Sequence, residues 1–96
     1  MIVRNVNGTA DSTCACGSWL THWARFSGQT VPTYCPEVSC VAKVELGAHV
    51  QNADPNDDGW YIVPMCRAHS TQIGQDVAIS NAIRLVSADI ASTCGA

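Results

Sequence analysis

The sequence predicts a small α+β domain, and three observations lead to this fold class. The chain has 96 residues, the length of one domain spanning residues 1–96. Hydrophobic residues make up 47% of the chain and charged residues 14%, which is typical of a globular protein and not of a disordered one. Segments with strand composition also alternate with segments that carry helix-capping signals, so the expected order is strand, helix, knuckle, hairpin, helix and strand.

The first part of the chain contains one strand signal and one helix signal. The segment IVRNV, residues 2–6, alternates between apolar and polar residues and predicts a short strand. A helix is expected to begin after Ser18, whose hydroxyl can cap it, and to end at Gly28. Trp19 and Trp23 stand four residues apart, so they share one face of this helix and are expected to pack into the core.

The second part of the chain predicts a β-hairpin followed by a short helix. VAKVEL, residues 41–46, and WYIVPM, residues 60–65, have strand composition, with Pro64 marking the end of the second strand. A short helix is expected over residues 66–74, ending at a glycine. Residues 77–88 are rich in Val and Ile and predict one or two further strands.

The turn between the two hairpin strands is acidic and invites comparison with a calcium loop. Asp54, Asn56 and Asp58 are followed by Gly59, as in the first half of such a loop. The position that requires a bidentate Glu is Met65 instead. We therefore expect a hairpin turn with solvated acids.

Six cysteines are many for a chain of this length, and they suggest either thiolate metal ligands or three disulfides. The opening MIVRNVNGT lacks the long apolar core of a signal peptide, which favours a cytoplasmic protein with reduced thiols. No apolar run is long enough to span a membrane, so no membrane association is expected. A secreted domain held by disulfides is the alternative.

The charge of the chain limits the kinds of partner. The formal net charge is −3, and the five Lys and Arg residues form no basic tract. Strong non-specific DNA binding is therefore not expected. The sequence does not distinguish a protein partner from a specific nucleic-acid partner.

Two pairs of potential ligands predict a zinc site. Cys35 and Cys40 form a Cys-x4-Cys pair, and Cys66 and His69 form a Cys-x2-His pair at an expected helix start. A tight loop and a first helical turn, separated by a hairpin, can supply the four ligands of a closed tetrahedral zinc site. The alternative is that the cysteines are buried free thiols and the histidine lies on the helix surface.

Three cysteines remain, and they suggest a second zinc site. Cys14, Cys16 and Cys94 can be completed to four ligands by His22, which lies one turn into the expected first helix. This arrangement would tie the two ends of the chain together. A Cys14–Cys94 or Cys16–Cys94 disulfide, or free thiols, are the alternatives.

The order of knuckle, hairpin and helix, with CPEVSC at the knuckle and IVPMCRAH at the helix start, resembles a treble clef over about residues 35–74. More narrowly, it resembles the ββα-metal core of HNH endonucleases. In that family a His closes the first hairpin strand, as His49 does in GAHV, so the resemblance implies a general base at His49. The chain departs from the family at Ala48, where a metal-binding acid often stands, at Tyr61, where an Asn often stands, and at Ser70, where a further ligand is usual.

These departures favour a non-enzymatic function. The preferred interpretation is a small zinc-binding module with structural metals and a binding or adaptor role. The alternative is a divergent HNH-type nuclease that uses His49. A binding surface, if present, is expected near Arg25, Tyr61, Arg67 and His49.

Overall fold

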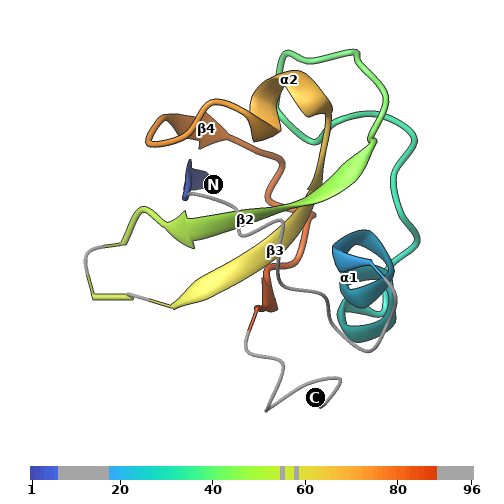
Figure 1. The fold of residues 1–96 in the computed structure, drawn as a ribbon, viewed down its shortest axis with the longest axis horizontal. Helices are drawn as coiled ribbons and strands as arrows, with labels where there is room; N and C mark the ends of the chain where they lie inside the picture. Colours follow the sequence, from blue (N-terminus) through green and yellow to red (C-terminus); the bar gives the residue numbers. More distant parts are fainter. Residues whose placement is uncertain (7–17, 55, 58, 89–96) are drawn as a thin grey trace.

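The computed structural model describes residues 1–6, 18–54, 56–57 and 59–88, and nothing is stated about the structure of the others. It confirms the predicted α+β class. Within the described residues, five antiparallel strands form one sheet in the order β4-β1-β2-β3-β5, accompanied by two helices (Figure 1). The elements are β1 (Ile2–Asn5), α1 (Trp19–Ser27), β2 (Leu46–Asn52), β3 (Trp60–Met65), α2 (Arg67–Ser70), β4 (Asp76–Ala78) and β5 (Val86–Ser87).

The β2–β3 hairpin forms the centre of the sheet. Its register runs from Leu46 opposite Met65 to Gln51 opposite Trp60. The acidic connection is a hairpin turn, in which the Asp57 carboxylate accepts hydrogen bonds from the Gly59 N–H and the Tyr61 hydroxyl. Asp57 therefore satisfies donors within its own turn, whereas solvated acids were expected here.

The first hairpin strand was predicted at residues 41–46, and this placement is wrong because the strand begins at Leu46 and runs to Asn52. We define the knuckle as residues 35–40. The residues before β2 fold back on the knuckle and on the segment that precedes it. The Cys35 N–H donates to the Ala42 carbonyl at 2.8 Å, and the Val44 N–H donates to the Thr33 carbonyl at 3.1 Å. The backbone of residues 42–44 is thus used to close the knuckle, and contact with β3 begins only at Glu45, whose N–H donates to the Met65 carbonyl at 3.1 Å.

The other predicted boundaries are largely confirmed. Ser18 caps α1 by accepting from the Thr21 N–H at 3.1 Å, and Gly28 ends the helix with a φ of 71°, where glycine is favoured. Pro64 lies one residue inside the end of β3, beyond the part of the strand that pairs with β5. The segment 77–88 supplies residues of both β4 and β5.

The second helix is shorter than predicted, covering Arg67–Ser70 and not residues 66–74. Asn5 of β1 explains its early end. The Asn5 side-chain amide donates to the carbonyls of His69 and Gln72, and the Asn5 carbonyl accepts from the N–H of Gly74. The carbonyls of His69 and Gln72, which a longer helix would offer to N–H groups four residues on, accept instead from N–H groups three residues on and from this buried side chain of a distant strand.

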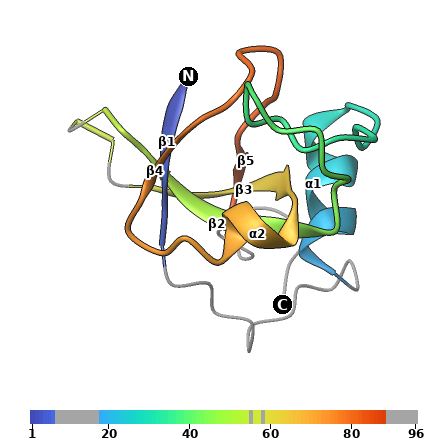
Figure 2. The same ribbon diagram turned by 90° about the horizontal axis from the view of Figure 1, so that it is seen from above.

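The two faces of the hairpin bury different sets of residues because successive strand residues point to opposite sides. On one face, Ala48, Val50 and Val63 belong to a core cluster that also contains Cys35 and Cys66. We call this the cysteine face. On the other, Ile62 packs with Trp23 of α1, and we call this the α1 face. Figure 2 shows β1 and β4 at the edge of the sheet that lies away from α1.

A glycine allows α1 to approach β2 closely. A Cβ atom at Gly47 would lie 2.7 Å from the carbonyl carbon of Trp19 and 2.8 Å from the nitrogen of Leu20. Both atoms belong to the helix backbone, which cannot move aside as a flexible side chain can.

Among the described residues, no helix is long and apolar enough to cross a membrane.

Candidate metal centre

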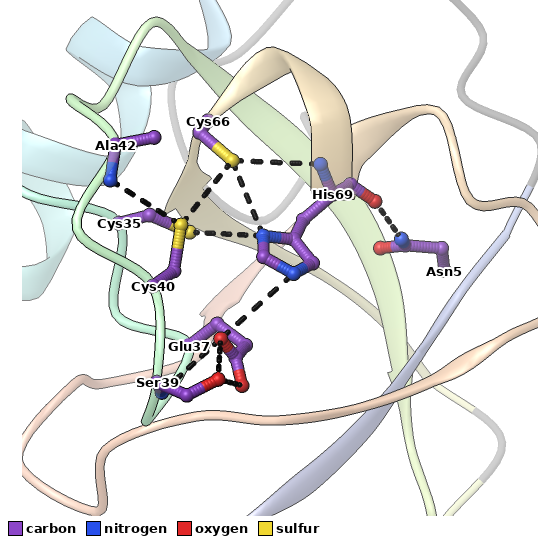
Figure 3. Close-up of polar contacts among 8 residues, drawn as sticks. All are labelled: Asn5, Cys35, Glu37, Ser39, Cys40, Ala42, Cys66 and His69. Atoms are coloured by element: carbon purple, nitrogen blue, oxygen red, sulfur yellow. Dashed lines mark hydrogen bonds and ion pairs between the residues drawn. The ribbon is translucent and has the colours of Figure 1, made fainter.

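The structure brings together the four residues of the first predicted zinc site. The ligand atoms of Cys35, Cys40, Cys66 and His69 all lie within 4.8 Å of one another (Figure 3). The Cys40 and Cys66 sulfurs are 3.9 Å apart, and the His69 Nδ1 lies 3.2 Å from the Cys66 Sγ and 3.7 Å from the Cys35 Sγ. With zinc–sulfur bonds of about 2.3 Å and zinc–nitrogen bonds of about 2.0 Å, tetrahedral ligand atoms lie roughly 3.5–3.8 Å apart. The cluster therefore fits one tetrahedral zinc ion.

The knuckle positions the first two ligands. The Cys40 N–H donates to the Glu37 carbonyl at 3.1 Å, which turns the chain back within a few residues. The Ala42 N–H then points at the Cys40 sulfur at 3.4 Å. The Cys-x4-Cys spacing thus produces two convergent thiols through local backbone hydrogen bonds.

The start of α2 positions the other two ligands. Cys66 is the N-cap residue, and its sulfur accepts from the His69 N–H at 3.5 Å. His69 lies three residues later, so its ring returns to the same side of the turn. Because Cys66 directly follows β3, the central hairpin carries this pair to the knuckle.

The thiols of the cluster differ in acidity. Burial raises the pKa of Cys35 to about 11, and the neighbouring Cys66 adds to this effect. Burial acts in the same direction on Cys66, but hydrogen bonds from the His69 N–H, the His69 ring and the two other thiols outweigh it and lower the pKa of Cys66 to about 7. Cys66 therefore ionises before Cys35, and a binding metal has to displace a proton from Cys35.

Two residues that contact this cluster were not predicted from the sequence. Glu37 lies between the two knuckle cysteines, and its Oε2 is 3.8 Å from the His69 Nε2. Asn5 holds the His69 carbonyl from β1. The position of Glu37 inside CPEVSC was the available signal for the first; the contact of Asn5 spans 64 residues of chain and has no local signal.

The second predicted zinc site cannot be compared in the same way, because Cys14, Cys16 and Cys94 lie outside the described residues. Its histidine, His22, is fully buried in α1. The His22 Nε2 lies 2.9 Å from the Ser87 carbonyl, and the ring packs against Trp19 and Phe26. Within the described part of the chain, the His22 Nδ1 has no hydrogen-bond partner.

The residue predicted as a general base, His49, lies in β2 on the α1 face and is 7% exposed. Its ring is 4.7 Å from that of Trp19 and 6.5 Å from that of Trp60, both in edge-on orientations. Burial, followed by the nearby His22 imidazole, lowers the pKa of His49. Side chains alternate along β2, so His49 points to the opposite side of the sheet from Ala48. The sheet therefore separates His49 from the cysteine face.

Of the four residues near which a binding surface was expected, the three other than His49 lie on different elements. Arg25 is on α1 and contacts the Phe26 ring. Tyr61 packs against the cysteine-face core, and Arg67 of α2 lies 3.8 Å from the Glu45 carboxylate. Since α1 covers the opposite face from Tyr61, the structure does not gather these residues into one patch.

Comparisons with protein-family models, with curated proteins and with solved structures gave no match to this chain. The function is therefore inferred from the chemistry of the four-residue cluster.

Proposed function

We propose that this protein is a zinc-binding module in which Cys35, Cys40, Cys66 and His69 hold one structural zinc ion. The observation that carries the proposal is the convergence of all four ligand atoms to within 4.8 Å. Four protein ligands complete a tetrahedral shell and leave no position for water or substrate, which is the arrangement of structural rather than catalytic zinc.

The location of the cluster supports a structural role. Its ligands come from the knuckle and from the start of α2, and Cys35 and Cys66 are buried in the cysteine-face core. A metal here would fasten the knuckle to the end of the central hairpin. In zinc-finger peptides such binding supplies on the order of 10 kcal/mol of folding free energy. Small domains have marginally stable cores, so a contribution of this size can decide whether the domain folds.

We further propose a treble-clef arrangement with a binding or adaptor role. The order of knuckle, β2–β3 hairpin and α2, with ligands at the first and last, supports the treble clef. Exposed apolar side chains at and beside the knuckle support a binding role, because such groups often mark contact surfaces. They are Tyr34, Val38 and Val41, of which Val41 is 85% exposed.

The second zinc ion, with Cys14, Cys16, His22 and Cys94 as ligands, remains a proposal. The His22 ring supports it. Since a carbonyl accepts hydrogen bonds, the Nε2 beside the Ser87 carbonyl carries the proton, and Nδ1 keeps its lone pair. Ligating histidines usually have this arrangement, with the other ring nitrogen bonded to a carbonyl or carboxylate.

The nuclease alternative receives no support from the position of His49. Its ring is buried on the α1 face, and the four-ligand cluster belongs to the cysteine face. We therefore favour a non-enzymatic role.

Native mass spectrometry of protein purified without added metal tests the proposal. We expect one zinc ion if the first site alone is occupied and two if both are. Substitution of Cys66 by Ser should remove one ion, whereas Ala68→Ser, which places a serine at an exposed position of the same helix, should remove none. A zinc-free protein with its cysteines in disulfides would overturn the proposal.

A further inference from the structure

We propose that Glu37 is a positioning residue that holds His69 in the tautomer needed to bind metal through Nδ1. This inference rests on the proposed zinc site. The Glu37 carboxylate faces the side of the His69 ring that points away from the three sulfurs (Figure 3). Glu37 is therefore a candidate outer-shell residue of the metal centre.

The two nitrogens of the His69 ring have different surroundings. Nδ1 lies 3.2 Å from the Cys66 sulfur and 3.7 Å from the Cys35 sulfur, whereas Nε2 lies 3.8 Å from the Glu37 Oε2. A neutral imidazole carries its proton on one nitrogen only. If Nδ1 supplies its lone pair to a metal, the proton must be on Nε2, where it faces the carboxylate.

The contact between Glu37 and His69 is electrostatic and partly shielded from water. A separation of 3.8 Å is longer than a direct hydrogen bond. However, the side chains of His69 and Glu37 are only 22% and 14% exposed, so solvent screens their attraction less than it would at the surface. A carboxylate at this position favours the Nε2–H tautomer and disfavours the Nδ1–H tautomer, which cannot bind the metal.

The knuckle holds the Glu37 side chain in this orientation. The Ser39 N–H donates to Oε2 at 3.1 Å, and the Ser39 hydroxyl donates to the same carboxylate at 2.9 Å. The Glu37 backbone also pairs with Ile79 in an isolated bridge. Acidic side chains are rarely this buried without partners, and here the partners leave the carboxylate directed at the ring.

Charge makes this placement informative. Three thiolates and one Zn²⁺ would give the site a net charge of −1, so an additional carboxylate is repelled by the site as a whole. An acidic residue with no role at the site would be more stable at a position farther from this negative charge. The N–H and O–H of Ser39 and the polarised Nε2–H of His69 offset this repulsion.

The test compares Glu37→Ala and Glu37→Gln with the unmodified protein and with Glu45→Gln as a matched control. Glu45 lies near α2 but pairs with Arg67 and not with His69. Zinc affinity is measured by competition with a chromophoric chelator at fixed pH. We expect Glu37→Ala to lose about 10-fold or more in affinity. Glu37→Gln should lose less, because its amide oxygen still attracts the Nε2–H, and Glu45→Gln should stay within about 2-fold.

A second readout separates positioning from general stability. In ¹⁵N NMR of the zinc-loaded proteins, His69 of the unmodified chain should show a metal-bound Nδ1 and a protonated Nε2. In Glu37→Ala the Nε2–H signal should shift and exchange faster with water. Unchanged ring signals, or equal affinity losses in Glu37→Ala and Glu45→Gln, would overturn the inference. Failure of the unmodified protein to bind zinc would instead overturn the proposed function.

Discussion

The histidines on the two sides of the central hairpin have contrasting environments. His69 lies among three sulfurs and a carboxylate, with a polar group facing each ring nitrogen. His22 and His49 lie on the α1 face, where their rings pack edge-on or tilted against Trp19, Phe26 and Trp60. The same residue type thus belongs to a candidate metal centre at His69 and to an aromatic core at His49.

This contrast shows that the surroundings of a histidine, more than its proximity in sequence to other polar residues, decide what it can do. His49 stands near the acidic turn in the sequence, and the resemblance to HNH endonucleases implied a general base there. In the structure Asp54 and Asp57 accept hydrogen bonds from backbone groups of that turn and from the Tyr61 hydroxyl, and His49 is buried against aromatic rings. The two sides should therefore respond differently to substitution, metal removal and pH.

The largest effect should follow loss of a ligand on the cysteine face. We expect Cys66→Ser, or removal of zinc by a chelator, to cost on the order of 10 kcal/mol of folding free energy and to unfold the domain. Circular dichroism during chelation measures this directly. Ala68→Ser should leave the chelator response unchanged, and a fully zinc-free protein that keeps its fold would contradict the account.

A smaller effect is expected on the α1 face from filling the space at Gly47. Gly47→Ala should lower the free energy of unfolding by about 1–3 kcal/mol, because the new methyl meets the backbone of α1. Gly59→Ala in the same hairpin is the matched control, since its nearest atoms are the ends of the Tyr61 and Asp57 side chains. Urea unfolding compares the two variants. Zinc stoichiometry should be equal in both variants. Loss of zinc in Gly47→Ala alone would show that packing on the α1 face affects the metal site on the cysteine face, contrary to this expectation.

The pKa of His49 predicts a pH effect from the α1 face. Burial and His22 lower this pKa below its ordinary value of 6.5, so the folded protein binds fewer protons at His49 than the unfolded chain does. The stability this provides is fully present above pH 6.5 and is lost as the pH falls through the folded-state value. Each unit of separation contributes about 1.4 kcal/mol.

His49→Phe keeps an aromatic ring but removes the titration. Its free energy of unfolding should therefore fall less than that of the unmodified protein between about pH 8 and pH 5. Zinc content is measured at each pH so that metal loss is not mistaken for the effect of His49. Identical pH profiles for the two proteins would contradict the assignment.

The smallest expected effect concerns catalysis. We expect no nicking of supercoiled plasmid by the protein in Mg²⁺ or Mn²⁺, because His49 is buried and separated from the ligand cluster by the sheet. His49→Ala should behave the same way. Metal-dependent nicking that disappears in His49→Ala would favour the nuclease alternative over the adaptor role.

Features set by local interactions were predictable from the sequence. Ser18 and Gly28 define α1 because capping involves only neighbouring backbone groups. The Cys-x4-Cys and Cys-x2-His pairs each converge through a single turn, and two such pairs separated by a hairpin indicated one site. Features that depend on distant partners were not predictable. The shift of the first hairpin strand follows from the pairing of residues 42–44 with residues 33–35, and the short α2 follows from the contacts of Asn5.

Zinc X-ray absorption spectroscopy identifies the atoms that bind the metal in the proposed site. The account predicts bound zinc with three sulfur ligands at about 2.3 Å and one nitrogen ligand at about 2.0 Å, and one sulfur fewer at this site in Cys35→Ser if that variant still binds metal. Since the proposed second site also has three sulfurs and one nitrogen, its occupancy would not change the average shell. The absence of bound zinc, or a shell made mainly of oxygen and nitrogen, would contradict the account.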